Sequence, residues 1–136
     1  MSYFLDTDSC IAILRPKPSL VRTRAERAIA RDGVLRISSV VVHELWYGAN
    51  KSQRVEENRL RLQDFLSAYV EVCAFDAGDA QVAGEIRAEL EKEGKRIGAL
   101  DTLIAGQCLR ADSVLVTSNT AEFIRVKGLR VEDWVK

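Results

Sequence analysis

The chain has 136 residues, of which 47% are hydrophobic and 29% charged, and its formal net charge at pH 7 is zero. This length fits a single domain over residues 1–136 that buries about two-thirds of the surface its unfolded chain exposes. No apolar run approaches the roughly 20 residues that cross a bilayer. The first residues also lack the basic and apolar regions of a signal peptide, so we expect a cytoplasmic protein without membrane association.

Cysteine and histidine content excludes several kinds of site. Cys10, Cys73 and Cys108 are odd in number and far apart, and no CxxC spacing occurs, so structural disulfides are not expected. His43 is the single histidine, which excludes a zinc site with several histidine ligands. A serine hydrolase triad would also need His43, and no nucleophile elbow surrounds the serines near it.

The predicted elements alternate between strands and helices. In chain order, the first half is expected to contain a strand at 3–5, a helical turn at 9–14, a helix at 20–29 capped by Ser19, a strand at 34–37, a helix running to about Ala49 and capped by Ser39, and a charged helix at 53–67. The second half is expected to contain a strand at 69–75, helices at 77–93 and 99–110, a strand at 113–117, a helical turn at 121–124 and a strand at 129–131.

This alternation indicates an α/β fold. The strands are short apolar runs, which is typical of a parallel sheet covered by helices on both faces. We therefore expect a three-layer α/β/α arrangement with a mainly parallel central sheet of four to five strands. Ligands of such sheets bind beyond the carboxyl ends of the strands. Asp6 and Ser118-Asn119 each follow a predicted strand, at this edge.

Three acidic residues stand among apolar or small neighbours. Asp6 follows Tyr3-Phe4-Leu5, Glu44 follows Val40-Val41-Val42-His43, and Asp101 lies in Gly98-Ala99-Leu100-Asp101-Thr102-Leu103-Ile104-Ala105. Carboxylates that converge without a cation repel one another and shift toward protonation, and a divalent cation removes that conflict. If the fold brings these residues together, a metal-dependent hydrolase is the simplest reading.

Each of the three carboxylates also has a purely structural interpretation. Asp6 can cap the helical turn that follows it, and Glu44 can be a solvent-facing helix residue. Asp101 can occupy the first turn of its helix, where the helix dipole favours negative charge. Only their joint occurrence favours a functional site.

Basic residues are distributed unevenly along the chain. Six of them lie between positions 15 and 31, interrupted by the single acidic residue Glu26. Such a run is either a solvated helix face or a surface that holds a phosphate backbone. The candidates for contact with nucleic acid are Arg15, Lys17, Arg22, Arg24 and, beside Gly98, Arg96.

Four motifs occur in a fixed order along the chain. They are Asp6-Thr7-Asp8 after a strand, Ser38-Ser39 with Glu44-Leu45 and Gly48-Ala49, Gly98 with Asp101-Thr102 and Ala105, and Thr117-Ser118-Asn119 with Glu122-Phe123. In this order and in a chain of this length, they closely resemble the PIN-domain ribonucleases, specifically the VapC toxins of bacterial toxin–antitoxin pairs. The resemblance extends over essentially the whole chain, including its end at Lys127–Trp134.

The resemblance implies an endoribonuclease that depends on Mg²⁺ or Mn²⁺. It maps the acidic cluster of the family onto Asp6, Glu44 and Asp101, with Asp6 and Asp101 as metal ligands and Glu44 as a ligand or a water-orienting base. Two positions depart from the family pattern: Asn119 stands where many PIN domains carry Asp, and Asp8 stands where related toxins often carry Asn. Both are further candidates for metal contact. The supporting hydrogen-bonding residues would be Thr7, Thr117, Ser118 and Asn119.

The resemblance also implies partners. VapC toxins are usually homodimers, and each is neutralised by a cognate VapB antitoxin. The C-terminal segment of VapB wraps the toxin and often places an arginine over the acidic site, whereas its N-terminal domain binds operator DNA. The toxin thus meets DNA only through its antitoxin. Its RNA substrates are structured, and tRNA is the first candidate.

Two other functions fit parts of the sequence. Asp6-Thr7-Asp8 at a strand end also resembles the DxD motif of haloacid dehalogenase-like phosphatases, in which the first Asp is a nucleophile. That family needs a lysine and a later acidic pair, and the later strand here leads to Ser118-Asn119. The third hypothesis is a PIN-like module that binds RNA or protein without cleaving it. It is suggested by Asn119, which stands where many PIN domains carry Asp.

Overall fold

Five short strands form one parallel sheet in the computed structural model, which describes residues 1–135. The strands are β1 (Ser2–Leu5), β2 (Val34–Ser38), β3 (Glu71–Cys73), β4 (Val114–Val116) and β5 (Arg130–Glu132). Their order across the sheet is β3-β2-β1-β4-β5, and every neighbouring pair is parallel. The expected α/β fold with a parallel sheet is confirmed, with five strands.

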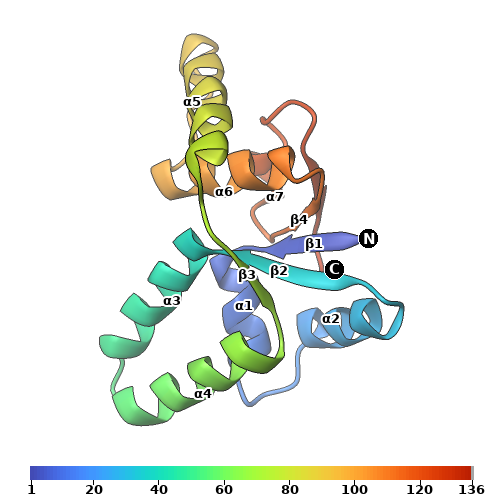
Figure 1. Cartoon of the computed structure of the whole chain (residues 1–136), viewed down its shortest axis with the longest axis vertical. Coiled ribbons are helices and arrows are strands. Elements are labelled where there is room, and N and C mark those ends of the chain that lie inside the picture. The colour runs from blue at the N-terminus through green and yellow to red at the C-terminus, as the bar shows by residue number, and fades with distance from the viewer. Residues whose placement is uncertain (136) are drawn as a thin grey trace.

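Helices cover both faces of the sheet (Figure 1). They are α1 (Thr7–Leu14), α2 (Leu20–Ala30), α3 (Ser39–Asn50), α4 (Val55–Ala68), α5 (Ala77–Lys92), α6 (Ala99–Arg110) and α7 (Thr120–Phe123). In Figure 1, α5, α6 and α7 lie above the sheet, whereas α1, α2 and α4 lie below it. No helix within residues 1–135 is long and apolar enough to cross a membrane.

The core lies on both sides of the central strands. Leu5 of β1, Ile37 of β2 and Leu115 of β4 have no exposed surface. Strands buried on both faces lose the alternation of apolar and polar residues, which is why these strands read as continuous apolar runs. Burial of each such side chain stabilises the fold by about 1.5–3 kcal/mol.

The strand order creates a switch point between β1 and β4. From β1 the chain builds the sheet toward β3, and it then returns to place β4 on the other side of β1. The two strands remain paired to their carboxyl ends, where the amide of Asp6 donates to the carbonyl of Val116 at 3.2 Å. In open α/β sheets this is the place where ligands bind.

Several predicted element ends are confirmed and others are wrong. Ser19 caps α2, and α6 spans 99–110 as expected. The cap of α3 is Ser38, however, whose hydroxyl accepts from the amide of Val40 at 3.0 Å, and Ser39 instead accepts from the amide of Phe75 at 3.0 Å. The strand predicted at 69–75 is confined to β3, because α4 continues to Ala68.

Candidate active site at the carboxyl edge of the sheet

Asp6 occupies the turn between β1 and α1. Its side chain is only 7% exposed, and its Oδ1 accepts from the amide of Ser9 at 2.9 Å, which makes it the N-cap of α1. The expected capping role is therefore confirmed, and α1 begins at Thr7 rather than at Ser9. Burial raises the pKa of the Asp6 carboxyl, hydrogen bonds from Thr117 and Ser9 oppose that shift, and Asp8 adds to it.

Asp101 lies in the first turn of α6, beside the N-cap residue Gly98. Burial is the largest cause that raises its pKa, which reaches about 6, and the charges of Glu122, Asp6, Glu44 and Asp8 raise it further. These carboxylates are separated widely in sequence, yet all act on one side chain. The fold thus brings the three predicted acidic residues into one electrostatic cluster.

Glu44 is held at this cluster by a hydrogen bond from another helix. It lies in the second turn of α3, and Thr7 Oγ1 at the start of α1 donates to Glu44 Oε1 at 2.6 Å. Thr7 was expected as a supporting residue, and this bond gives it a definite contact. The bond leaves the second carboxylate oxygen of Glu44 available to another donor or to a cation.

The segment after β4 supplies the remaining polar groups. Thr117 is buried and its hydroxyl accepts from the amide of Asn119 at 2.9 Å, whereas Ser118 and Asn119 are exposed. The Asn119 side chain donates to the Glu122 carboxylate. Glu122 was not predicted as a site residue, although its place three residues after Asn119 is a usable signal.

The carboxylate oxygens of the site are the ligand type that a hard divalent cation prefers, but they do not converge on one point. Among residues 1–135, no three His, Cys, Asp or Glu side chains lie close enough together to hold a metal ion. Within the same residues, Asp6, Glu44 and Asp101 form no ion pair, so their negative charge is uncompensated. Mg²⁺ keeps several waters and binds through one or two carboxylates, which suits acidic groups spaced this way.

Some of the predicted RNA-binding residues have partners within the protein, whereas others are exposed. Arg22 donates to the carbonyl of Ile13 at 2.7 Å and also to that of Arg15, so it caps the C-terminal end of α1. Arg24 donates to the carbonyl of Asp133 at 3.0 Å. Both therefore have structural partners. Lys17 and Arg96 are exposed.

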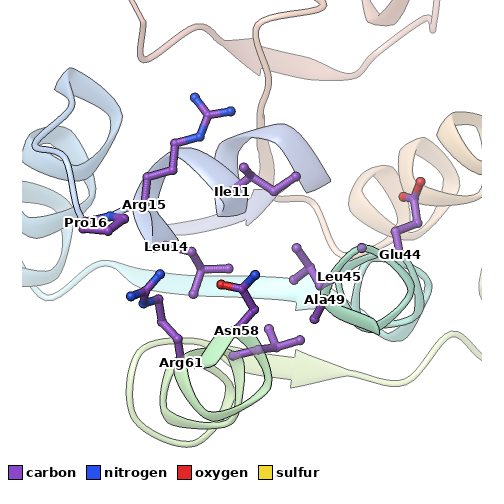
Figure 2. A pocket seen from close by; sticks show the side chains of 11 residues that line it. Ile11, Leu14, Arg15, Pro16, Glu44, Leu45, Ala49, Asn58 and Arg61 are labelled. Carbon is purple, nitrogen blue, oxygen red and sulfur yellow. The ribbon is translucent and has the colours of Figure 1, made fainter. Parts of the chain in front are cut away.

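A groove of about 270 Å³ leads away from Glu44 between α1, α3 and α4 (Figure 2). Apolar side chains, among them Leu14 and Leu45, line its middle. In Figure 2 Glu44 stands at one end, and the guanidinium groups of Arg15 and Arg61 stand toward the other. The groove therefore has an acidic end, an apolar middle and a basic end.

Comparison with known proteins identifies the family of this chain. The PIN domain family model matches residues 3–129, which is nearly the whole chain. The chain belongs to the PIN-domain family. Its relatives place it among the VapC ribonucleases of that family: it is 43% identical over 134 residues to the tRNA(fMet)-specific endonuclease VapC of Shigella flexneri, with 98% of each chain covered. It is 38% identical to ribonuclease VapC2 of Rickettsia felis, with both chains covered completely.

Solved VapC structures have the same fold. The crystal structure of VapBC2 from Rickettsia felis, bound to a fragment of its promoter DNA, matches with a TM-score of 0.91 and 37% identity over 98% of this chain and 99% of the other. DNA-bound VapBC from Salmonella typhimurium matches with a TM-score of 0.89 and 39% identity over 98% of both chains. The resemblance inferred from the four motifs is thereby confirmed.

Proposed function

We propose that this chain is a metal-dependent endoribonuclease toxin of a type II toxin–antitoxin pair, which hydrolyses phosphodiester bonds in tRNA and so inhibits translation. The observation that carries the proposal is the convergence of separate carboxylates on Asp101, whose pKa is raised to about 6. A cluster of uncompensated negative charge destabilises the fold, and carboxylates perturbed in this way occur most often at binding and catalytic sites. We place the protein in the cytoplasm, where tRNA is found.

Each acidic residue of the site has a separate role in the proposed reaction. Asp6 and Asp101 would hold Mg²⁺ or Mn²⁺, and Asp8 and Asn119 are further candidate ligands. Such a cation, when bound, makes a coordinated water more acidic and stabilises charge on the phosphate. Glu44, oriented by Thr7, would contact the cation or accept a proton from the attacking water. Asp101 contributes as a ligand only when it is deprotonated, so activity should rise as the pH passes its pKa of about 6.

The first candidate substrate is initiator tRNA, because two VapC relatives at 43% and 39% identity are named tRNA(fMet)-specific endonucleases. The test is incubation of the purified protein with total cellular tRNA and Mn²⁺ or Mg²⁺, followed by sequencing of the new RNA ends. We expect discrete cleavage that EDTA abolishes and that Asp6→Asn and Asp101→Asn lack. Asp64→Asn, an exposed acid on α4, is the matched control and should cleave normally.

Three outcomes would contradict the proposed reaction. If folded Asp6→Asn protein cleaves as fast as the wild type, the metal is not held by these residues. A phosphoenzyme intermediate on Asp6 would favour the haloacid dehalogenase-like reading. Absence of cleavage by folded, antitoxin-free protein would favour the PIN-like binding module.

We further propose a VapB-type antitoxin as the partner. An arginine of its C-terminal segment would pair with the acidic cluster beside Glu44, and its apolar residues would fill the groove lined by Leu14 and Leu45. Operator DNA would be bound by the antitoxin. Co-expression with the small reading frame next to the gene should yield a complex and relieve toxicity. Failure of that frame product to bind would contradict this partner.

We also propose a homodimer. Four large apolar side chains on α2, α3 and α4 are exposed by 42% to 63%, and they are Leu20, Ile29, Tyr47 and Leu60. Exposed apolar patches mark association surfaces, so these residues are the candidates for the dimer surface. Light scattering on the purified chain should give twice the mass of 15.2 kDa. A monomeric mass at micromolar concentration would contradict the homodimer.

A further inference from the structure

Two chain segments lie side by side at the upper border of the acidic cluster. One, residues 96–101, leads into α6, and the other, residues 122–125, contains the end of α7. Arg125 Nη1 donates to the carbonyl of Arg96 at 3.0 Å. Within the first segment, a Cβ atom on Gly98 would lie 3.3 Å from Asp101 Oδ2, so the Asp101 carboxylate lies against the backbone of that segment. We call the pair of segments the α6–α7 rim.

The α6–α7 rim presents positive charge that no carboxylate neutralises directly. Arg96 and Arg125 are exposed, and neither forms an ion pair with any residue in 1–135. The charge of Arg96 acts on the Glu91 carboxylate, which is already paired with Arg87 at 2.9 Å. The bond to the Arg96 carbonyl uses one nitrogen of Arg125, so most of its donors remain free. Lys95 and Lys127 add charge beside them.

An exposed apolar side chain lies next to these cations in the chain. Ile124 directly precedes Arg125 and is 75% exposed. Arginine, lysine and an exposed apolar contact next to a cluster of metal-binding acids are the groups that nucleic acid needs. The cations hold the phosphates, and the aliphatic surface covers a sugar or a base.

The basic run on α2 is a poorer candidate for the same task. Arg22 uses both Nε and Nη2 on the backbone carbonyls of Ile13 and Arg15. Arg22 also lies at the far end of α1 from Asp6, and the eight residues of that helix span about 12 Å. The α6–α7 rim, by contrast, directly adjoins Asp101.

We propose that Arg96 and Arg125 form the phosphate-binding edge of this active site and hold the RNA backbone beside the bond that is cut. The inference rests on the proposed ribonuclease function and names the part of the protein that binds its substrate. The charge of the two arginines offsets the repulsion between RNA and the carboxylates, so it acts on substrate binding and not on the chemical step.

The test measures RNA binding apart from cleavage. In an Asp101→Asn background, a fluorescein-labelled initiator tRNA transcript is titrated by anisotropy from 50 to 200 mM salt. The double variant Arg96→Gln/Arg125→Gln should bind about tenfold more weakly at 50 mM salt. Because each phosphate contact contributes about 0.7 to 1 to the log–log salt slope, that slope should fall by about 1.5 to 2. In the Asp101 parent, the same double variant should raise KM and leave kcat unchanged.

Three comparisons make this test decisive. Lys51→Gln/Arg59→Gln removes two cations that lie over the rings of Tyr47 and Trp46, and it should change binding less than twofold. Arg96→Lys/Arg125→Lys keeps the charge and should retain most of the salt slope. Arg27→Gln/Arg31→Gln probes the rival surface on α2, and thermal melts show that every variant is folded.

The inference and the proposed function fail in different ways. The inference is overturned if Arg96→Gln/Arg125→Gln binds RNA as tightly as its parent does. It is also overturned if Arg27→Gln/Arg31→Gln loses as much RNA affinity as the rim variant. Either result holds even if the wild type cleaves RNA. Absence of metal-dependent cleavage by the wild type overturns the proposed function, and the binding assay then still decides on the α6–α7 rim. Absence of RNA binding by the parent protein overturns both.

Discussion

Asp101 shows how a functional carboxylate costs stability. Its pKa is about 6 in the folded protein and 3.8 in a free side chain, so the folded state holds the proton more tightly than the unfolded state does. The cost is therefore absent below pH 4, grows as the pH rises toward 6, and is complete above it. We expect Asp101→Asn to raise the free energy of unfolding by about 1–2 kcal/mol at pH 7.5, after allowance for solvent screening of a partly exposed group.

Urea denaturation of the Asp101→Asn variant and the wild type at pH 4 and pH 7.5 measures this effect. The gain should shrink strongly at the lower pH, because wild-type Asp101 is then protonated in the native state. Asp64→Asn controls for the loss of one charge. Equal stability of the wild type and Asp101→Asn at both pH values would show that Asp101 is not strained by its neighbours.

Thr7 is the residue that fixes the orientation of Glu44. Thr7→Val keeps the shape of the side chain and removes the hydroxyl that donates to Glu44 Oε1 at 2.6 Å. We expect kcat for RNA cleavage to fall about tenfold with little change in KM, because the general base or ligand loses its position. Thr7→Ser should restore most of the rate. Thr23→Val, which removes a comparable hydroxyl bond on α2, should leave cleavage unchanged.

The pair α5 and α6 positions Asp101 through an unusually close helix contact. A Cβ atom on Gly106 would lie 2.8 Å from the backbone of Ala83, whereas one on Gly84 would meet no atom within 4 Å. Gly106→Ala should therefore destabilise the fold by about 1–3 kcal/mol and lower activity by displacing α6. Gly84→Ala should instead stabilise it by up to about 1 kcal/mol. Chemical denaturation of both variants checks the contrast, and similar stabilities would contradict the close packing.

For the molecule as a whole, binding of a divalent cation should be linked to stability. A cation at 100 times its Kd adds about 2.7 kcal/mol to the free energy of unfolding, which should raise the Tm by several degrees. The shift should be larger at pH 7.5 than at pH 5.5, because protonated Asp101 competes with the cation. Thermal melts with Mn²⁺ measure it without any RNA. An equal shift in Asp6→Asn or Asp101→Asn would place the cation elsewhere.

The local sequence was sufficient for the kind and order of the elements. Apolar periodicity located every helix and strand, and Ser19 marked the start of α2 correctly. The local sequence predicted the wrong cap for α3, because either of two adjacent serines can cap a helix. Ser38 is the cap, and Ser39 instead contacts Phe75, which is distant in the sequence. The four motifs also selected Asp6, Glu44 and Asp101, and the charges of the first two act on Asp101 in the folded protein.

The distances between those residues came from tertiary packing alone. Return of β4 to the side of β1 brings Thr117 to Asp6, and the α6–α7 rim brings Glu122 to Asp101. No local sequence signal predicts that these residues lie close together. Helix caps and apolar periodicity depend on a few neighbouring residues, whereas the order of the strands is fixed by burial of the whole core. The chemistry of the site is therefore readable in the residue types, but its electrostatics exist only where the folded strands and helices meet.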